Sequence, residues 1–90
     1  MAWKVDLSPT ALKQLGKLDK SVSHRILNFL RQRVEKLNDP RQIGQRLQGT
    51  LSEFWKYRVG DYRLICSLEE DDRLVVLVLR IGHRREVYKR

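Results

Sequence analysis

The sequence predicts an α+β domain in which a helical hairpin packs on a mainly antiparallel four-stranded sheet. Three observations predict it: polarity alternates near the N-terminus, apolar residues recur at helical spacing between residues 8 and 38, and alternation returns after residue 53. The element order is therefore β-α-α-β-β-β, which suits helices gathered on one face of a sheet. A chain of 90 residues is long enough for a single domain, residues 1–90, and too short for two.

The N-terminal segment predicts one strand followed directly by a helix. From Ala2 to Leu7 the polarity alternates with the period of two that a half-buried strand requires. Ser8-Pro9 then predicts a helix start, because a serine side chain caps the first turn and proline suits the first helical position. Apolar residues at helical spacing continue as far as Leu18.

A second helix is predicted to begin near Asp19 or Ser21 and to stop at Asn38-Asp39-Pro40. Its apolar residues form one stripe that can pack on a sheet. The polar side chains on its other faces are Lys20, His24, Arg25, Arg31, Arg33 and Lys36. This basic side is either a solvated face or a contact for RNA or an acidic partner, and His24 is expected at the surface.

Three more strands are predicted after a polar loop at residues 41–50, which has one helical turn around residues 43–47. The strands run from Glu53 to Val59, from Tyr62 to Leu68 and from Arg73 to Ile81. Gly60-Asp61 predicts the first turn between them and residues 69–72 predict the second. Every position from Leu74 to Leu79 is apolar, so the last strand is predicted to be central, with both faces buried.

The charge of the chain indicates polyanionic partners. Nineteen Lys and Arg against eleven Asp and Glu give a net charge of +8, and so strong a positive potential attracts polyanions. Nucleic acid is therefore the first partner class, an acidic protein the second and a membrane surface the third. No apolar run approaches the roughly 20 residues of a membrane span, and the N-terminus lacks a secretory signal. A cytoplasmic protein without a membrane partner is expected.

Neither a metal nor a cofactor is expected. Two histidines, one cysteine and scattered carboxylates show no ligand spacing, and no glycine-rich phosphate loop or nucleotide cofactor motif is present. Cys66 lies among strand residues, which predicts a small buried hydrophobe rather than a nucleophile.

The predicted hairpin around Gly60-Asp61 gathers cations. Alternation and pairing place Lys56, Arg58 and Arg63 on one face, with Arg58 and Arg63 within roughly 5 to 8 Å, directly opposite or diagonal. Like charges opposite each other destabilise a sheet, and a local rule broken without compensation tends to mark function. The alternative is that each side chain extends into solvent and does nothing more.

The C-terminal segment leaves the last predicted strand at Gly82 and supplies His83, Arg84, Arg85 and Tyr88. Arginines hold a phosphate and its developing charge, and a histidine titrates near neutral pH. An aromatic ring stacks on an unpaired base, so the set suits single-stranded RNA better than duplex.

These fragments resemble, in order and spacing, the RelE toxins of bacterial and archaeal toxin–antitoxin pairs. The hairpin motif is present as Lys56-Tyr57-Arg58 and Tyr62-Arg63-Leu64, and the C-terminal motif as Gly82-His83-Arg84-Arg85-Glu86-Val87-Tyr88. Leu47-Gln48-Gly49 resembles the loop before the hairpin. The resemblance covers essentially the whole chain and implies a RelE-like fold, similar to that of microbial ribonucleases.

The resemblance implies an endoribonuclease that cuts messenger RNA in the ribosomal A site by 2′-hydroxyl attack and so inhibits translation. Lys56 and Arg58 would lie near the attacking hydroxyl and the scissile phosphate. Arg63 would stabilise charge on the phosphate, Arg84 would approach the leaving oxygen, and Tyr88 would stack on or orient a codon base. The implied RNA-binding set is Lys56, Arg58, Arg63, Arg84, Arg85 and Tyr88.

The general base is left open by the sequence. Arg58 stands where the best-known members have a second lysine, and arginine holds its proton at any ordinary pH. Lys56 among arginines loses its proton more readily, because like charges disfavour its charged form. His83 is chemically the better base but points away from Arg84 in an extended segment. A third possibility is catalysis by electrostatics and positioning alone.

The resemblance also implies partners: a RelB-like antitoxin that covers the basic surface, the 70S ribosome with messenger RNA, and operator DNA bound only through the antitoxin complex. Two alternatives compete with the nuclease. A ParE-like toxin shares the fold but poisons DNA gyrase, and a plain RNA-binding module would bind without cutting. Whether messenger RNA is cut in a translating extract separates the three.

Overall fold

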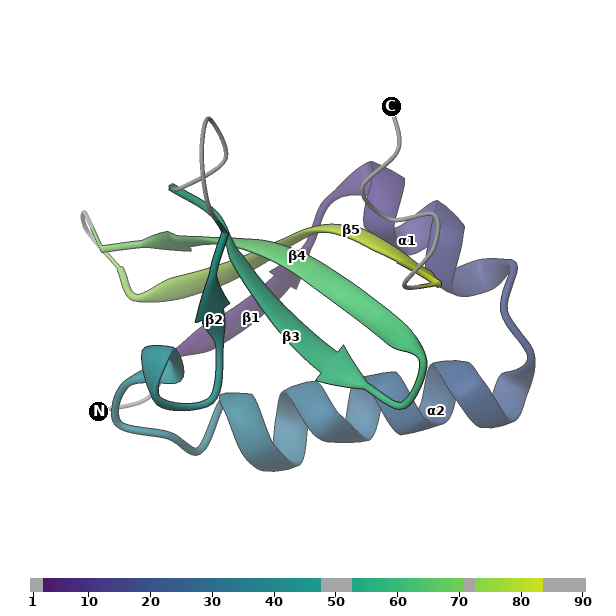
Figure 1. The fold of residues 1–90 in the computed structure, drawn as a ribbon, viewed down its shortest axis with the longest axis horizontal. Coiled ribbons are helices and arrows are strands. Elements are labelled where there is room, and N and C mark those ends of the chain that lie inside the picture. The colour runs from purple at the N-terminus through teal and green to yellow at the C-terminus, as the bar shows by residue number, and fades with distance from the viewer. Residues whose placement is uncertain (1–2, 48–52, 71–72, 84–90) are drawn as a thin grey trace.

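The computed structural model describes residues 3–47, 53–70 and 73–83 as two helices packed on one face of a five-stranded sheet. The elements are β1 (Lys4–Leu7), α1 (Pro9–Gly16), α2 (Lys20–Phe29), β2 (Gln45–Arg46), β3 (Trp55–Val59), β4 (Tyr62–Glu69) and β5 (Val75–His83). Figure 1 shows α2 running along one side of the sheet below β3 and β4, with α1 near β5. The predicted α+β class and its helical hairpin are confirmed.

The strands follow the order β1-β5-β4-β3-β2 across the sheet. β1 runs parallel to β5, and the other neighbours are antiparallel. β5 lies between β1 and β4, which confirms the prediction of a central last strand. The four predicted strands are present, and the sheet gains a fifth because β2 pairs with Trp55 and Lys56 at the edge of β3.

The segment before β3 differs from the prediction. A 3₁₀ helix covers Pro40–Gln42, and a short strand replaces the helical turn expected around residues 43–47. The turn begins early because the Asp39 side chain accepts a hydrogen bond from the Arg41 N–H (3.0 Å). Gly44 then passes close to the core, where a Cβ would lie 3.0 Å from the ring of Tyr57. The chain next reaches the edge of β3, whose backbone groups it pairs.

The helices begin as predicted, but the second changes form. Ser8 accepts a hydrogen bond from the N–H of Ala11 (3.0 Å), which confirms the predicted cap. α2 continues past Phe29 as a π-helical turn, Leu30–Val34, instead of a regular helix to residue 37. Directly after this wider turn, the Glu35 carboxylate accepts the N–H of Val5 (3.0 Å) on the outer edge of β1.

The core fills the space between the helices and the sheet. Its buried members are Trp3, Ala11, Leu15, Ile26, Leu30, Val34, Tyr57, Val59, Leu64, Cys66, Val76, Val78 and Ile81. The hydroxyl of Tyr57 donates to the carbonyl oxygen of Pro40 (2.8 Å), so the one polar atom of this ring is satisfied. Burial raises the pKa of the Tyr57 phenol and of the Cys66 thiol, which confirms Cys66 as a buried hydrophobe.

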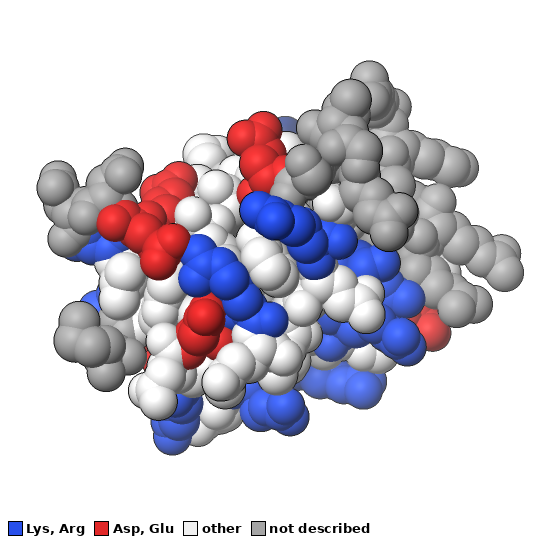
Figure 2. All heavy atoms as spheres, turned by 60° about the vertical axis from the view of Figure 1, so that its left-hand side comes forward, with Lys and Arg blue, Asp and Glu red and all other residues white. Residues whose placement is uncertain are grey.

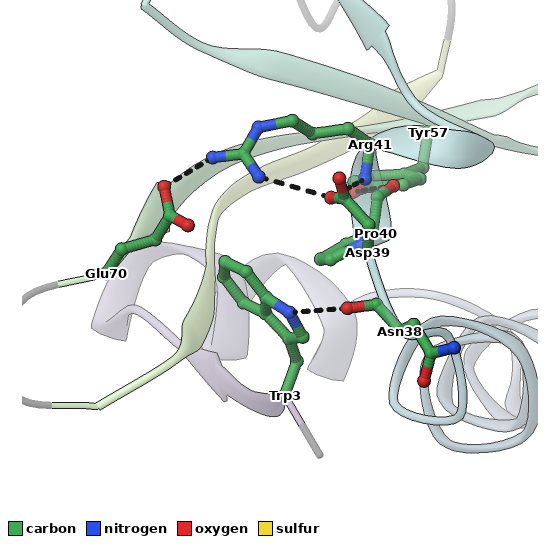
Figure 3. Close-up of polar contacts among 7 residues, drawn as sticks. All are labelled: Trp3, Asn38, Asp39, Pro40, Arg41, Tyr57 and Glu70. Carbon is green, nitrogen blue, oxygen red and sulfur yellow. Dashed lines mark hydrogen bonds and ion pairs between the residues drawn. The ribbon is translucent and has the colours of Figure 1, made fainter. Parts of the chain in front are cut away.

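Arg41 connects the 3₁₀ turn to three other parts of the chain, and Figure 3 shows its ion pairs with Asp39 and Glu70. Its guanidinium donates to Asp39 (3.1 Å) and to Glu70 (2.6 Å), and its Cζ lies 5.8 Å from the ring centre of Trp3 and 6.0 Å from that of Trp55. The hydrogen bond to Glu70 raises the pKa of Arg41. This contact set holds in place the segment that leads into β2.

Candidate nucleic-acid interface

The β3–β4 hairpin places the three predicted cations on one face of the sheet. Arg58 and Arg63 are direct partners across the two strands, and Lys56 is the partner of Ile65. Paired residues share a face and faces alternate along a strand, so Lys56, Arg58 and Arg63 all lie on the face away from the helices. We call this side of the sheet the open face. The predicted approach of Arg58 and Arg63 is confirmed, in its directly opposed form.

The turn of the hairpin requires glycine. Gly60 has a positive φ of 62°, and a Cβ there would lie 3.1 Å from a guanidinium nitrogen of Arg25 on α2. Arg63 reaches back over the turn, where its Nη1 donates to the carbonyl oxygens of Gly60 (3.5 Å) and Tyr62 (3.3 Å). The predicted turn at Gly60-Asp61 is confirmed, and it brings a helix arginine close to the cationic hairpin.

Two cations of the hairpin, Arg58 and Arg63, have no acidic partner in the part of the chain that the structure describes. Arg41 forms ion pairs there with Asp39 and Glu70, but neither Arg58 nor Arg63 takes part in one. Direct opposition of like charges costs stability. Arg58 is exposed and Arg63 is half-buried, so both can accept an anion from solvent. The arrangement makes this face a candidate site for an anionic ligand.

A fourth cation, Arg80, joins the open face and was not among the predicted site residues. Simple alternation from Val76 and Val78 would place Arg80 toward the core. The register between β4 and β5 shifts at Ile65/Cys66, so that Val78 pairs with Cys66 but Arg80 pairs with Ile65. This bulge turns Arg80 outward and Ile81 inward, where Ile81 is buried. A charged residue at a nominal core position was the signal in the sequence.

The cations of the open face lie in two rows across the strands. Lys56, Ile65 and Arg80 form one row, and Arg58 and Arg63 belong to the next, which ends at Gly82. Strand spacing places Arg80 diagonal to Arg63, about 7–8 Å away at the backbone. Ile65, buried with Leu47 and next to Phe54, forms a small apolar patch inside this frame.

His83 lies on the other side of the sheet. It is the partner of Tyr62, and the two rings meet edge to face with centres 5.8 Å apart. Tyr62 packs against the core, so His83 faces away from Arg58 and Arg63. The other predicted C-terminal site residues, Arg84, Arg85 and Tyr88, lie outside the described residues. His24 is exposed on α2, as predicted.

Positive charge gathers on a broad part of the surface. Figure 2 shows Lys and Arg side chains forming a band across the right and lower parts of the view, with most of the acidic side chains toward the upper left. Within the described ranges, no cluster of three or more His, Cys, Asp or Glu is placed to hold a metal ion. No helix in those ranges is long and apolar enough to cross a membrane.

Comparisons with known proteins place the chain among small toxins of this architecture. The RelE–RelB complex of Pyrococcus horikoshii contains a chain that is 30% identical, with a TM-score of 0.69 over 97% of this protein and 100% of that chain. In the RelBE2 toxin–antitoxin complex of Mycobacterium tuberculosis, the matching chain is 26% identical with a TM-score of 0.82, over 93% of this protein and 100% of that chain. Toxin RelG of the same organism is 28% identical over the full length of both proteins.

The family match, together with these relatives and the shared fold, identifies a toxin of the RelE/ParE superfamily, from a type II toxin–antitoxin system. The family described as "ParE toxin of type II toxin-antitoxin system, parDE" matches residues 5–88, and the chain belongs to it. The resemblance to RelE toxins is thereby confirmed at the level of the superfamily.

Proposed function

We propose that this protein is a ribosome-dependent endoribonuclease that cuts messenger RNA in the ribosomal A site and thereby stops translation in the cytoplasm. One observation carries the proposal: Arg58 and Arg63, neither of which has an acidic partner among the described residues, oppose each other directly on the open face. Lys56 lies on the same face. Such a cluster is costly for the fold and useful for holding a phosphodiester. The names of the relatives, RelG and RelE, also favour a RelE-type activity over a ParE-type activity.

In the proposed reaction the 2′-oxygen of one nucleotide attacks the adjacent phosphorus, and the bond from phosphorus to the 5′-oxygen breaks. The products are a cyclic phosphate and a free 5′-hydroxyl. Arg58 and Arg63 neutralise the charge that grows on the phosphate oxygens. We assign Arg84 to the leaving 5′-oxygen, either as the general acid that protonates it or as a charge that stabilises it while water supplies the proton. Tyr88 is assigned to stack on a codon base, and Arg85 to add a contact to the RNA backbone.

Lys56 is the proposed acceptor of the 2′-hydroxyl proton. The register places Lys56 on the same face as Arg58 and Arg63, whereas His83 lies on the opposite face against Tyr62. A base must reach the proton that it removes, so position favours Lys56 over His83. Catalysis by charge and positioning alone predicts that Lys56→Arg retains most of the activity, while a lysine base predicts a large loss.

The proposed partners are a RelB-like antitoxin, the 70S ribosome and messenger RNA, with operator DNA bound only through the antitoxin complex. The matching chain from Mycobacterium tuberculosis comes from the structure of a toxin–antitoxin complex, and that from Pyrococcus horikoshii from the structure of a RelE–RelB complex. A net charge of +8 favours an antitoxin with an acidic surface, which would cover the cations until it is removed.

A translating extract supplied with purified protein tests the proposal. Primer extension on a defined messenger RNA should show new 5′ ends within the codon of stalled ribosomes, and none when translation initiation is blocked. Arg58→Gln should lower the cleavage rate strongly. Arg31→Gln, which removes the same charge from the π-helical turn of the chain, should leave the rate unchanged. Intact messenger RNA with the wild-type protein would rule out the nuclease.

The family match favours a second candidate, inhibition of DNA gyrase, because the family that contains this chain is described as ParE. A gyrase poison would spare messenger RNA and instead stop supercoiling of plasmid DNA by purified gyrase. Both assays use the same protein preparation, so comparing messenger RNA cleavage with gyrase inhibition separates the two activities. RNA binding without cleavage and without gyrase inhibition would identify a plain RNA-binding module.

A further inference from the structure

A hollow at the free edge of β3 continues the open face toward α2. Its volume is about 280 Å³, it is open to solvent, and its lining residues are Phe29, Arg33, Ile43, Gln45, Lys56 and Arg58. β2 pairs only with Trp55 and Lys56, so this strand stops short and leaves the hollow beside the rest of β3.

The lining combines two chemical features. Arg33, Lys56 and Arg58 carry positive charge, and no carboxylate is among the described residues that line the hollow. Phe29 and Ile43 supply apolar surface, and both also pack against the core, so this surface is held in place. Apolar surface beside several cations matches a nucleotide, which offers a base with two apolar faces and a phosphate with negative charge.

Three separate parts of the fold build the hollow. Arg33 comes from the π-helical turn that follows α2, a form of helix that often occurs at functional sites. Ile43 and Gln45 come from the segment that follows Arg41, whose guanidinium contacts the rings of Trp3 and Trp55. Lys56 and Arg58 come from β3, where they also belong to the cluster proposed to hold the scissile phosphate.

We propose that this hollow binds the nucleotide next to the scissile phosphate, with its base against Phe29 and Ile43 and its phosphate against Arg33. The inference rests on the proposed function and deepens it, because Lys56 and Arg58 line both places and one RNA strand can pass from one to the other. The volume lies just below the range of about 300–1,000 Å³ that is usual for small-molecule pockets, which suits one nucleotide rather than several.

An acidic segment of a protein partner is the competing occupant, since carboxylates would also pair with the arginines. The apolar side of the hollow and its continuity with the phosphate cluster favour the nucleotide. RNA is therefore the occupant argued here, and binding of a protein segment alone is an outcome of the test.

The test compares Arg33→Gln with Arg31→Gln. The two arginines are two positions apart in the same turn, and both are exposed. Arg31 lines a different hollow, together with Val5, Leu12 and Glu35. The two variants therefore lose the same charge on two different surfaces. The probe is a short single-stranded RNA with 2′-O-methyl groups, which block cleavage, and its binding is measured by fluorescence anisotropy over a range of salt concentrations.

Arg33→Gln should weaken binding about three- to tenfold and should reduce the slope of log K against log salt by about 0.7, the value for one phosphate contact with a single strand. Arg31→Gln should change neither quantity, and both variants should keep the melting temperature of the wild type. An abasic site moved along the RNA should weaken binding most at one position next to the cleavage site, because that base is the one held by Phe29 and Ile43.

Equal RNA affinities for the two variants would overturn the inference, as would no binding of the probe by the wild-type protein at low salt. A loss of antitoxin affinity in Arg33→Gln with RNA affinity unchanged would also overturn it and assign the hollow to the protein partner. The extract assay separates these failures from failure of the proposed function. If the wild-type protein cleaves messenger RNA but the two variants bind RNA with equal affinity, only the inference about the hollow is wrong. If the wild-type protein does not cleave messenger RNA, the proposed nuclease function is wrong as well.

Discussion

The two faces of the β3–β4 hairpin differ in almost every respect. On the face toward the helices, Tyr57, Leu64 and Cys66 are buried, and the Tyr57 hydroxyl has its hydrogen-bond partner in Pro40. On the open face, Arg58 and Arg63 oppose each other without an acidic partner among the described residues. The same backbone hydrogen bonds between β3 and β4 hold both faces in place. The comparison indicates that the buried face stabilises the hairpin and offsets the repulsion between Arg58 and Arg63 on the open face.

The largest expected effect is on activity, from Arg63→Ala. Removing one group that stabilises developing charge typically costs about 10²–10³ in rate. The substitution also removes a like-charge pair, so the melting temperature should stay equal or rise slightly. Cleavage rates in the extract and thermal unfolding followed by circular dichroism measure the two quantities. A fully active Arg63→Ala protein would remove the open face from the reaction.

Leu64→Ala, one residue further along β4, should have the opposite profile. Leu64 is fully buried, and truncation of a core leucine costs about 2–5 kcal/mol through lost transfer energy and the cavity left behind. For a domain of this size each kcal/mol lowers the melting temperature by about 4–8 °C. Urea unfolding should show a lower midpoint with an unchanged m-value. Activity per folded molecule, measured well below the new midpoint, should match the wild type.

Alkaline pH should weaken the buried face specifically. Burial raises the pKa of Tyr57 and Cys66 above their ordinary values of 10.0 and 9.0, so the unfolded chain loses these protons first. Their contribution is fully present below pH 9 and decreases as the pH rises further, by up to about 1.4 kcal/mol per pH unit for each group. Tyr57→Phe should be less stable at neutral pH but should lose stability less steeply above pH 10. Equal slopes for the two proteins in urea titrations would contradict this account.

The sequence predicts the buried face better than the open face, for a physical reason. Alternation identified the inward residues of β3 and β4. The Gly60-Asp61 turn predicted that Arg58 and Arg63 lie close together, but it left open whether they are directly opposite or diagonal. The second helix ends at Val34, before the predicted stop at Asn38-Asp39-Pro40, and Pro40 instead begins the 3₁₀ helix Pro40–Gln42. The π-helical turn at Leu30–Val34 was not predicted, because its two buried residues, Leu30 and Val34, have the four-residue spacing of a regular helix.

Two features of the site depend on contacts between distant segments, which a local pattern does not contain. The strand at Gln45–Arg46 exists because β3 offers an edge to pair with, and a polar segment with glycines gives no sign of that. The hollow brings together Arg33 and Arg58, which are 25 residues apart in the sequence. The bulge in β5 is intermediate: its position was not predicted, yet a charged residue after six apolar ones was visible.

Replacing Arg80 should have the smallest effect of these substitutions, and it tests directly which face of the sheet Arg80 belongs to. Only the bulge in β5 assigns Arg80 to the open face. If Arg80 contributes to RNA binding, Arg80→Gln should weaken binding of the 2′-O-methyl probe about two- to fivefold and lower the salt slope by about 0.7, with no change in melting temperature. Lys13→Gln, an exposed cation on α1, is the matched control and should change neither quantity. An arginine that faced the core, as strict alternation requires, would instead change the stability of the protein when replaced and leave the salt slope intact.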